Sequence, residues 1–453
     1  MSRDSQTHHP PASPRHEPEI IYQIFPDRFR CARPETNPTP GAWHYHGKPI
    51  GVSTERTLLC NSPTDQFTFM GGDLEGIRQS LPYLRELGVT SVYLNPIFAA
   101  RSTHRYDAID FHRIDPVLGD RRDFERLAAD LHASGMRLWL DGVFNHTSHE
   151  HPWHVDQTTR KRFYALRTES EAMTWMNSGH LPKLDTQNPE VLRAILDVVA
   201  AWPEVDGWRL DAGHLLPRQT LRAIRAAVAP RPVVVEDWHF GAHYFEQRLA
   251  DGVTNFLFRE AMRAFFIEDC SPETLAARLS TWIDGYPAMA AARSWTFLDN
   301  HDTARFRTTV GPGRMERALV FLFTLPGTPL IFQGTEMGLD GRTEGESRAP
   351  IPWDEREWDL AVMGTVKRLI ALRKDNPVLA CGSFRPLYAD NRSRTLAFER
   401  VSPEARAVVA VNDGYHGSRF GIGTEAFDLD AGEWRIVLYS ADGMRRQIGP
   451  TGV

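Results

Sequence analysis

The pentapeptide GWRLD, residues 207–211, decides the fold of this chain. It is a short apolar run between two helical patterns, as expected for a buried strand of a parallel sheet. Alternate residues of a strand share a face, so Arg209 and Asp211 point the same way. A structural ion pair explains the pentapeptide as well as catalysis does. Two further apolar runs lead to carboxylates, Glu236 in PVVVED and Asp302 in WTFLDNHD, and this recurrence favours a catalytic site.

Short apolar runs of this kind alternate with helical patterns along most of the chain, and eight of them can be counted. Eight is the number of strands that a (β/α)8 TIM barrel needs. Before the second run, Asp73 is suited to cap a helix that Pro82 should kink and Gly88 should end. The eight predicted strands are 20–25, 91–97, 137–143, 207–211, 232–236, 252–256, 294–298 and 329–333.

Two segments depart from the barrel pattern. Residues 146–188 are mostly irregular, and a connection of that length predicts a small lobe inserted after strand 3. After Asn376, the short strands 396–398, 407–411 and 434–438 predict a C-terminal antiparallel β domain, a β-sandwich at 377–453. The catalytic barrel is thus predicted at 19–376. Residues 1–18, polar and rich in proline, are predicted to form a disordered leader.

Composition narrows the class of ligand. The chain has 453 residues and a formal net charge of −6 without a basic block, which argues against nucleic acid. No apolar run reaches the length that a membrane span needs. The four cysteines (Cys31, Cys60, Cys270 and Cys381) show neither metal nor disulfide spacing, so free thiols in a reducing compartment are expected. We therefore predict a cytoplasmic protein that acts on a small molecule.

In a barrel of this type the active site lies at the C-terminal ends of the strands. The residues gathered there are carboxylates, imidazoles and one guanidinium, without a phosphate loop or an activated serine or cysteine. They are Asp27, Asn95, Asp141, Asn145, His146, Arg209, Asp211, Glu236, Asp299, His301 and Asp302.

Paired carboxylates of this kind suggest glycoside cleavage. Arg209 would keep Asp211 ionised as the nucleophile. Glu236 would be a partly buried general acid, its protonation favoured further by Asp237 if the two lie close. Asp302 would stabilise the positive charge of the transition state.

Four ordered motifs carry a resemblance to glycoside hydrolase family 13, the α-amylase family: DGVFNH (141–146), GWRLDAGH (207–214), VEDWH (235–239) and FLDNHD (297–302). The resemblance implies a retaining mechanism with Asp211 as nucleophile, Glu236 as acid/base and Asp302 as stabiliser. It also implies a set of substrate-binding residues. These are His104, Tyr106, Asp141, His146, Arg209, His214, His301 and Arg348.

Within the family, LPKLD (181–185) resembles the fifth motif of the neopullulanase, cyclomaltodextrinase and maltodextrin glucosidase branch. This branch implies cleavage of α-1,4-glucosidic bonds in short malto-oligosaccharides or cyclodextrins, giving glucose and maltose. Its members usually carry an N-terminal β domain that supports dimerisation, whereas only residues 1–19 precede the first predicted strand here. We therefore expect a monomer or homodimer without a strict preference for cyclodextrins. Val235 replaces the glycine that is usual before the acid/base.

Cofactors and alternative functions complete the prediction. His146, His149, His151 and His154 lack the HExxH spacing of a zinc site, and the stretch after Asp27 lacks the acidic series of a calcium site. No cofactor is therefore expected, with calcium left unassigned. A transglycosylase or isomerase of the same family, making trehalose-type or sucrose-type products, is one alternative. A non-catalytic carbohydrate-binding protein is another.

Overall fold

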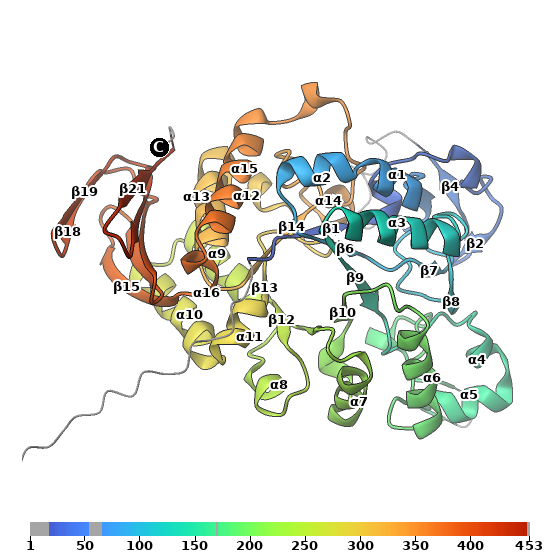
Figure 1. Ribbon diagram of the computed structural model, residues 1–453. Helices are drawn as coiled ribbons and strands as arrows, with labels where there is room; N and C mark the ends of the chain where they lie inside the picture. The colour runs from blue at the N-terminus through green and yellow to red at the C-terminus, as the bar shows by residue number, and fades with distance from the viewer. Residues whose placement is uncertain (1–17, 54–65, 169–170, 451–453) are drawn as a thin grey trace, which may run out of the picture.

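The computed structural model describes residues 18–53, 66–168 and 171–450 and contains a closed parallel barrel of eight strands (Figure 1). Each strand falls within or overlaps a run that the sequence predicted. Around the barrel the order is β1-β14-β13-β12-β11-β10-β9-β6. The strands are β1 (Ile21–Ile24), β6 (Ser91–Leu94), β9 (Arg137–Gly142), β10 (Gly207–Leu210), β11 (Val233–Asp237), β12 (Gly252–Asn255), β13 (Trp295–Thr296) and β14 (Thr328–Phe332).

Alternation along β10 sorts its residues between the two sides of the barrel wall. Trp208 and Leu210 belong to the large cluster between the barrel and its helices. Gly207 faces inward, where a Cβ atom would lie 2.5 Å from the ring of Trp139, so only glycine leaves room for that indole. The barrel interior is filled, as expected of this fold. Its inner cluster is Ile21, Tyr93, Trp139, Val234, Trp295, Phe297 and Leu330.

Helices surround the barrel and follow the predicted alternation. The first helical segment is broken where Pro82 enters: α1 is capped by Asp73, whose carboxylate accepts from the N–H of Gly76 at 2.6 Å, and α2 ends at Gly88 with φ of 93°. The longer helices all bury apolar residues against the barrel. The helices outside the lobe are α1 (Leu74–Gln79), α2 (Leu81–Leu87), α3 (Arg121–Ala133), α6 (Pro189–Ala200), α7 (Arg218–Val228), α8 (Ala242–Glu246), α9 (Phe256–Phe266), α10 (Pro272–Gly285), α11 (Ala288–Arg293), α12 (Phe306–Val310), α13 (Pro312–Thr324), α14 (Glu344–Ser347), α15 (Leu360–Asp375) and α16 (Val378–Cys381).

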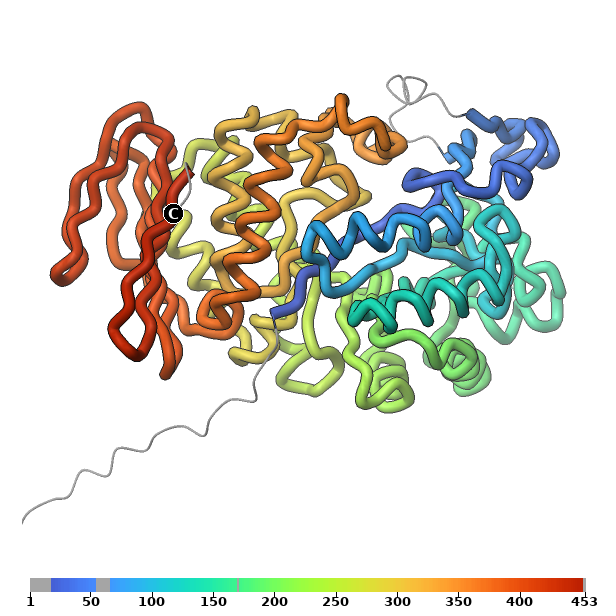
Figure 2. Tube along the Cα trace, turned by 45° about the horizontal axis from the view of Figure 1, so that its top comes forward, coloured from blue at the N-terminus to red at the C-terminus, as the bar shows by residue number. Residues whose placement is uncertain are grey.

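The connection after β9 forms a lobe at one end of the molecule (Figures 1 and 2). It holds α4 (Pro152–Val155), α5 (Gln157–Phe163) and a 3-10 turn at Trp175–Asn177, tied by four antiparallel bridges that include His146 to Lys183. The sequence did not predict the short hairpins that flank it, because they show no periodicity. One of these, β2 (His44–Tyr45) with β3 (Lys48–Pro49), meets the lobe where the ring of His46 stacks on His180 at 3.6 Å. The other short strands are β4 (Gly51–Val52), β5 (Thr68–Phe69), β7 (Phe98–Ala99) and β8 (Asp110–Ile114).

The C-terminal β domain lies at the end opposite the lobe (Figure 2). Its antiparallel sheet has the order β15-β16-β17-β20-β21, and a hairpin of β18 and β19 covers one face. The other face packs on the barrel helices, as where Phe398 stacks on Phe321 of α13 at 6.0 Å. The predicted strands correspond to β16, β17 and β20. The full set is β15 (Ser383–Asp390), β16 (Thr395–Val401), β17 (Ala405–Asn412), β18 (Ser418–Ile422), β19 (Glu425–Leu429), β20 (Trp434–Ser440) and β21 (Arg445–Ile448).

Three sequence predictions, on the leader, the cysteines and membrane spans, can be compared with the described residues only in part. Nearly all of the predicted leader at 1–18, and Cys60, lie outside them. Cys31, Cys270 and Cys381 are free thiols. Across residues 18–53, 66–168 and 171–450, none of the helices is long and apolar enough to cross a lipid bilayer.

Candidate active site

Arg209 is the centre of the polar cluster at the C-terminal ends of the strands. Its Nη1 lies 2.7 Å from both oxygens of Asp141 on the neighbouring strand β9 and 3.1 Å from Oδ1 of Asp211. Its Nη2 lies 3.0 Å from Oε1 of Glu236 on β11. One buried guanidinium therefore contacts three carboxylates from three adjacent strands, and it fixes Asp211 and Glu236 beside one another.

The backbone after the nucleophile candidate holds the second carboxylate. Ala212 has φ of 44° and ψ of 36°, a left-handed conformation that is costly for a residue with a side chain and that clusters at functional sites. Its N–H donates to Oε2 of Glu236 at 2.7 Å. The indole N–H of Trp238 lies 3.3 Å from Oε1 of the same carboxylate. The strained turn thus positions Glu236 against Asp211.

The pKa of Asp211 is raised well above its ordinary value. Burial is the largest cause and the charge of Glu236 the next, while Arg209 acts in the opposite direction. The sequence predicted that Arg209 would keep Asp211 ionised. The contact is present, but the low dielectric of the site and the second carboxylate outweigh it.

Asp141 is engaged entirely by protein groups. Its Oδ2 accepts from the hydroxyls of Tyr93 at 2.7 Å and Tyr106 at 2.9 Å, and Arg209 donates to both of its oxygens. The side chain is buried in the barrel mouth. These bonds fix the guanidinium and the Tyr106 ring, and the sugar contact that the resemblance implies for Asp141 stays a prediction.

The surroundings of His301 favour the neutral imidazole and one of its tautomers. Burial, together with the charges of Arg348 and Arg209, holds its pKa well below the ordinary range. The amide of Gln23 donates to Nδ1 at 2.8 Å, so Nε2 carries the ring hydrogen. That nitrogen lies 2.6 Å from the Tyr106 hydroxyl and 3.1 Å from Oδ2 of Asp302. The N–H of His301 therefore points at the Tyr106 hydroxyl and the Asp302 carboxylate.

Asp302 is held from two sides. Arg348 donates through Nη2 to its Oδ1 at 3.0 Å and through Nε to the carbonyl of His301 at 2.6 Å. Glu344 holds the same guanidinium at 2.5 Å. Because the Asp302 side chain remains one-third exposed, its carboxylate faces the mouth while its orientation is fixed.

Two histidines line the neighbouring walls. His146 is buried, its pKa is lowered to about 4 by burial, and its Nε2 has no hydrogen-bond partner in the described part of the chain. The ring of Trp175, on the lobe, packs over it at 5.6 Å. His104 contacts Gln66 at 3.1 Å and accepts from the N–H of Tyr106 at 3.1 Å. Burial lowers the pKa of His104 as well.

Some predicted residues do not join this cluster. Asp27 accepts from the N–H of Met70 at 3.0 Å, and Asp299 from that of Phe306 at 2.5 Å, so both serve their own loops. Asp237 accepts from the hydroxyl of Tyr244 at 2.8 Å, because alternate residues of β11 point to opposite sides and only Glu236 faces the mouth.

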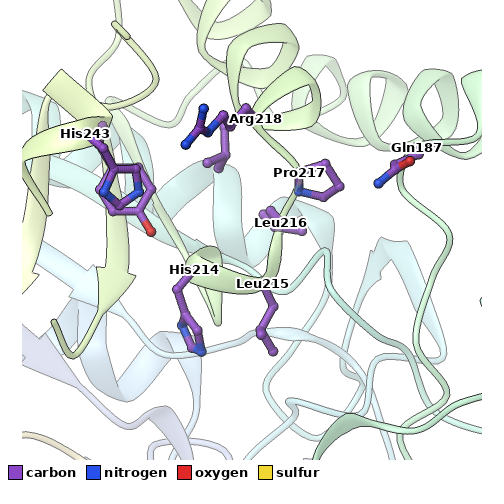
Figure 3. Close-up of a pocket in the computed structure, with 9 residues that line it drawn as sticks. Gln187, His214, Leu215, Leu216, Pro217, Arg218 and His243 are labelled. Atoms are coloured by element: carbon purple, nitrogen blue, oxygen red, sulfur yellow. The ribbon is translucent and has the colours of Figure 1, made fainter. Parts of the chain in front are cut away.

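His214 lies apart from the cluster too. It is exposed on the 3-10 turn after β10 and lines a separate pocket of about 370 Å³ (Figure 3). Arg218 at the start of α7 and His243 of α8 line the same pocket. Its predicted contact to sugar stays a prediction.

Sequence reasoning missed several members of the site. Gln23 joins Asn95 to His301, with its amide 3.0 Å from Oδ1 of Asn95, and Asn95 donates to the Tyr106 hydroxyl at 2.8 Å. Tyr93 and Trp175 were also missed. For Gln23 a signal existed: it is the polar residue in the apolar run IIYQIF, on the same strand face as Ile21.

The comparisons with known proteins agree with this geometry. The sequence profile described as "Alpha amylase, catalytic domain" matches residues 23–362. Neopullulanase 2 of Thermoactinomyces vulgaris is 34% identical over 427 residues, which cover 87% of this chain and 69% of that protein. A cyclomaltodextrinase of Geobacillus thermopakistaniensis (strain MAS1) is 33% identical over 446 residues, covering 93% and 73%. Among solved structures, the ligand-free cyclic alpha-maltosyl-(1→6)-maltose hydrolase of Arthrobacter globiformis has a TM-score of 0.82 at 29% identity and covers 93% of this chain and 98% of its own.

Proposed function

Because this chain belongs to the α-amylase family of glycoside hydrolases, we propose that it cleaves α-1,4-glucosidic bonds of short malto-oligosaccharides and cyclodextrins, releasing glucose and maltose. The observation that carries the proposal is the single guanidinium of Arg209, which contacts both Asp211 and Glu236. Two carboxyl groups held by one guanidinium favour the retaining mechanism, in which they lie about 5 Å apart and no water has to fit between nucleophile and sugar.

In the proposed mechanism each step uses side chains of the cluster. Asp211 attacks the anomeric carbon while Glu236 gives its proton to the departing glycosidic oxygen, and a glycosyl ester forms on Asp211. Glu236, now ionised, removes a proton from water, which attacks the same carbon and releases Asp211. Asp302 faces the positive charge that develops on the ring in both steps. His301, whose N–H points at the Tyr106 hydroxyl and Asp302 in the free protein, is proposed to contact a sugar hydroxyl.

The names of the relatives support hydrolysis over the alternatives. The solved neighbour is named a hydrolase and the two sequence relatives a neopullulanase and a cyclomaltodextrinase; none of the three is named an isomerase or transferase. The intact trio of Asp211, Glu236 and Asp302 weighs against a protein that only binds carbohydrate. Neutral sugars also suit a mouth whose charged groups are already paired with one another.

The proposed function is tested by product analysis. Incubation with maltotriose and with γ-cyclodextrin is expected to release glucose and maltose, and proton NMR should show the α anomer first. The Asp211→Ala variant serves as the control for contaminating activity. Equal sugar release by both proteins, or a first product in the β form, would contradict the proposal.

We also propose that turnover needs no bound metal. The acid, the nucleophile and the stabilising carboxylate are all supplied by the chain, and within the described ranges no three side chains of His, Cys, Asp or Glu are arranged to hold a metal ion. Dialysis against EDTA is therefore expected to leave kcat/KM for maltotriose unchanged. A loss of activity that Ca²⁺ restores would overturn this expectation.

A cytoplasmic location and a monomeric or homodimeric state complete the proposal. The unpaired thiols of Cys31, Cys270 and Cys381 support a reducing compartment. Sedimentation of the purified protein at several concentrations would distinguish the two oligomeric states.

A further inference from the structure

A second pocket, with a largely apolar lining and three arginines, lies at the other end of the barrel from the carboxylate cluster. It has a volume of about 390 Å³ and is built where β11 and β12 begin. Its walls come from the last turn of α7, from α8 and the segment after it, and from α11, which follow one another along the lower side of Figure 1. The lining residues are Arg225, Phe245, Arg248, Ala250, Asp251, Pro287, Met289, Ala290 and Arg293.

The lining carries an excess of positive charge. Three arginines face one carboxylate, Asp251, so the lining carries a net positive charge although Arg225 and Arg293 share that carboxylate. Asp251 is itself occupied: its Oδ2 accepts from the N–H of Val233 at 3.0 Å and its Oδ1 from Arg225 at 2.7 Å. Arg293 reaches the same Oδ1 at 3.5 Å. Asp251 therefore ties β12 to β11 and has little capacity left to neutralise further cations.

A purely structural role explains part of this arrangement. Arg225 and Arg293 stand in the last turns of α7 and α11, where a cation interacts favourably with the helix dipole. Arg248 has no such role. Its side chain is exposed, its backbone has φ of 54°, and its guanidinium has no hydrogen bond or ion pair with any residue that the structure describes. Nε of Arg225 is buried and also lacks a partner in the described ranges. Unused donors thus remain on two of the three arginines.

We propose that this pocket is a binding site for a small phosphomonoester, separate from the site of glycoside cleavage. Guanidinium groups match a dianionic phosphate in charge and in the geometry of their parallel N–H donors. The left-handed backbone at Arg248 belongs to the turn that ends α8, where the N–H of Leu249 donates to the carbonyl of Tyr244 at 2.7 Å, and it leaves the guanidinium exposed at the rim. Phe245, Pro287 and Met289 provide an apolar wall against which a sugar or base attached to the phosphate packs.

The proposal is tested by isothermal titration of the full chain at constant ionic strength, since exposed charges are screened by salt. Glucose 6-phosphate carries a sugar on its phosphate and AMP carries a nucleoside, whereas inorganic phosphate provides the anion alone. We expect at least one ester to bind saturably with one site per chain, and more tightly than inorganic phosphate, which does not cover the apolar wall. No step requires catalytic activity, so the result is independent of the proposed function.

Two variants give the test its control. Arg248→Glu reverses a charge that no described residue needs, and it is expected to weaken ester binding by at least about tenfold. Arg222→Glu makes the same change at an exposed site on α7 outside the pocket and is expected to leave binding unchanged. Thermal melting checks that both variants fold. Equal affinity in the two variants, or no saturable binding of either ester at millimolar concentration, would overturn the assignment.

Discussion

Replacing Asp211 with Asn is expected to lower kcat for maltotriose by at least about 10⁴-fold, because the amide cannot form the glycosyl ester on which both steps depend. Replacing Glu236 with Gln is expected to lower it by about 10² to 10⁴-fold, the usual contribution of a general acid. Both side chains are nearly the same size as the originals. The bonds of Glu236 to the N–H of Ala212 and to Trp238 involve its carboxylate oxygens, and one of these is preserved in the amide.

The two roles can be separated with α-glucosyl fluoride, whose leaving group departs without a proton. The first step on this substrate should survive in Glu236→Gln and be lost in Asp211→Asn. Rapid-quench measurement of fluoride release reports that step directly, and added azide should then react with the ester that accumulates in Glu236→Gln to give an α-glucosyl azide. If both variants lose fluoride release to the same extent, the assignment of nucleophile and acid is wrong.

The strands of the barrel were predictable because each one is buried on both sides and bounded by helical patterns. Buried parallel strands are continuous apolar runs, and GWRLD and PVVVE stand out on that basis alone. Even β13, with two residues at Trp295–Thr296, lies inside the predicted run 294–298. The short hairpin at 44–49 and the one that pairs Phe98 with Ile114 carry no such pattern, since long-range contacts rather than local periodicity hold them.

Part of the site was predictable because carboxylates that follow parallel strands gather at one end of a barrel, although Asp27, Asp237 and Asp299 do not join the cluster. What the sequence could not supply is which groups share a partner. Arg209 contacts three carboxylates, and both oxygens of Asp141 accept from protein donors. Both facts depend on the neighbouring positions of β9, β10 and β11 around the barrel. The direction of the Asp211 pKa also depends on burial, which sequence spacing does not measure.

His214 lies apart from the other residues that the resemblance implies as sugar contacts. It follows Asp211 by three residues, but the left-handed turn at Ala212 carries the chain away from the cluster. The imidazole is then exposed beside Arg218 and His243 instead of facing Glu236. The turn at Ala212, with φ of 44°, thus sets where this side chain lies, and its contact to sugar stays a prediction.

Replacing Arg209 with Met is expected to damage stability and catalysis together, because it leaves Asp141, Asp211 and Glu236 buried without their shared cation. Removing one partner of a buried ion pair costs about 3 to 5 kcal/mol in the free energy of unfolding. The deficit should grow as the pH rises above the ordinary pKa of Asp, about 3.9, since the folded variant holds protons on carboxyls that the unfolded chain releases. Arg209→Lys should recover only part of the loss, because one ammonium cannot reach three carboxylates at once.

The pH dependence distinguishes this role from simple packing. Arg209 lowers the pKa of Asp211 against the effect of burial, so its removal raises that pKa further, and the acid limb of kcat/KM should move to higher pH. The rate at the optimum should fall by about 10² to 10³-fold or more. Arg373→Met is the matched control: that guanidinium is equally buried and donates to the carbonyls of Phe323 at 2.8 Å and Leu325 at 3.0 Å, far from the nucleophile. It should lower the melting temperature and leave the acid limb in place. If the acid limb does not move in Arg209→Met, the guanidinium does not lower the pKa of Asp211.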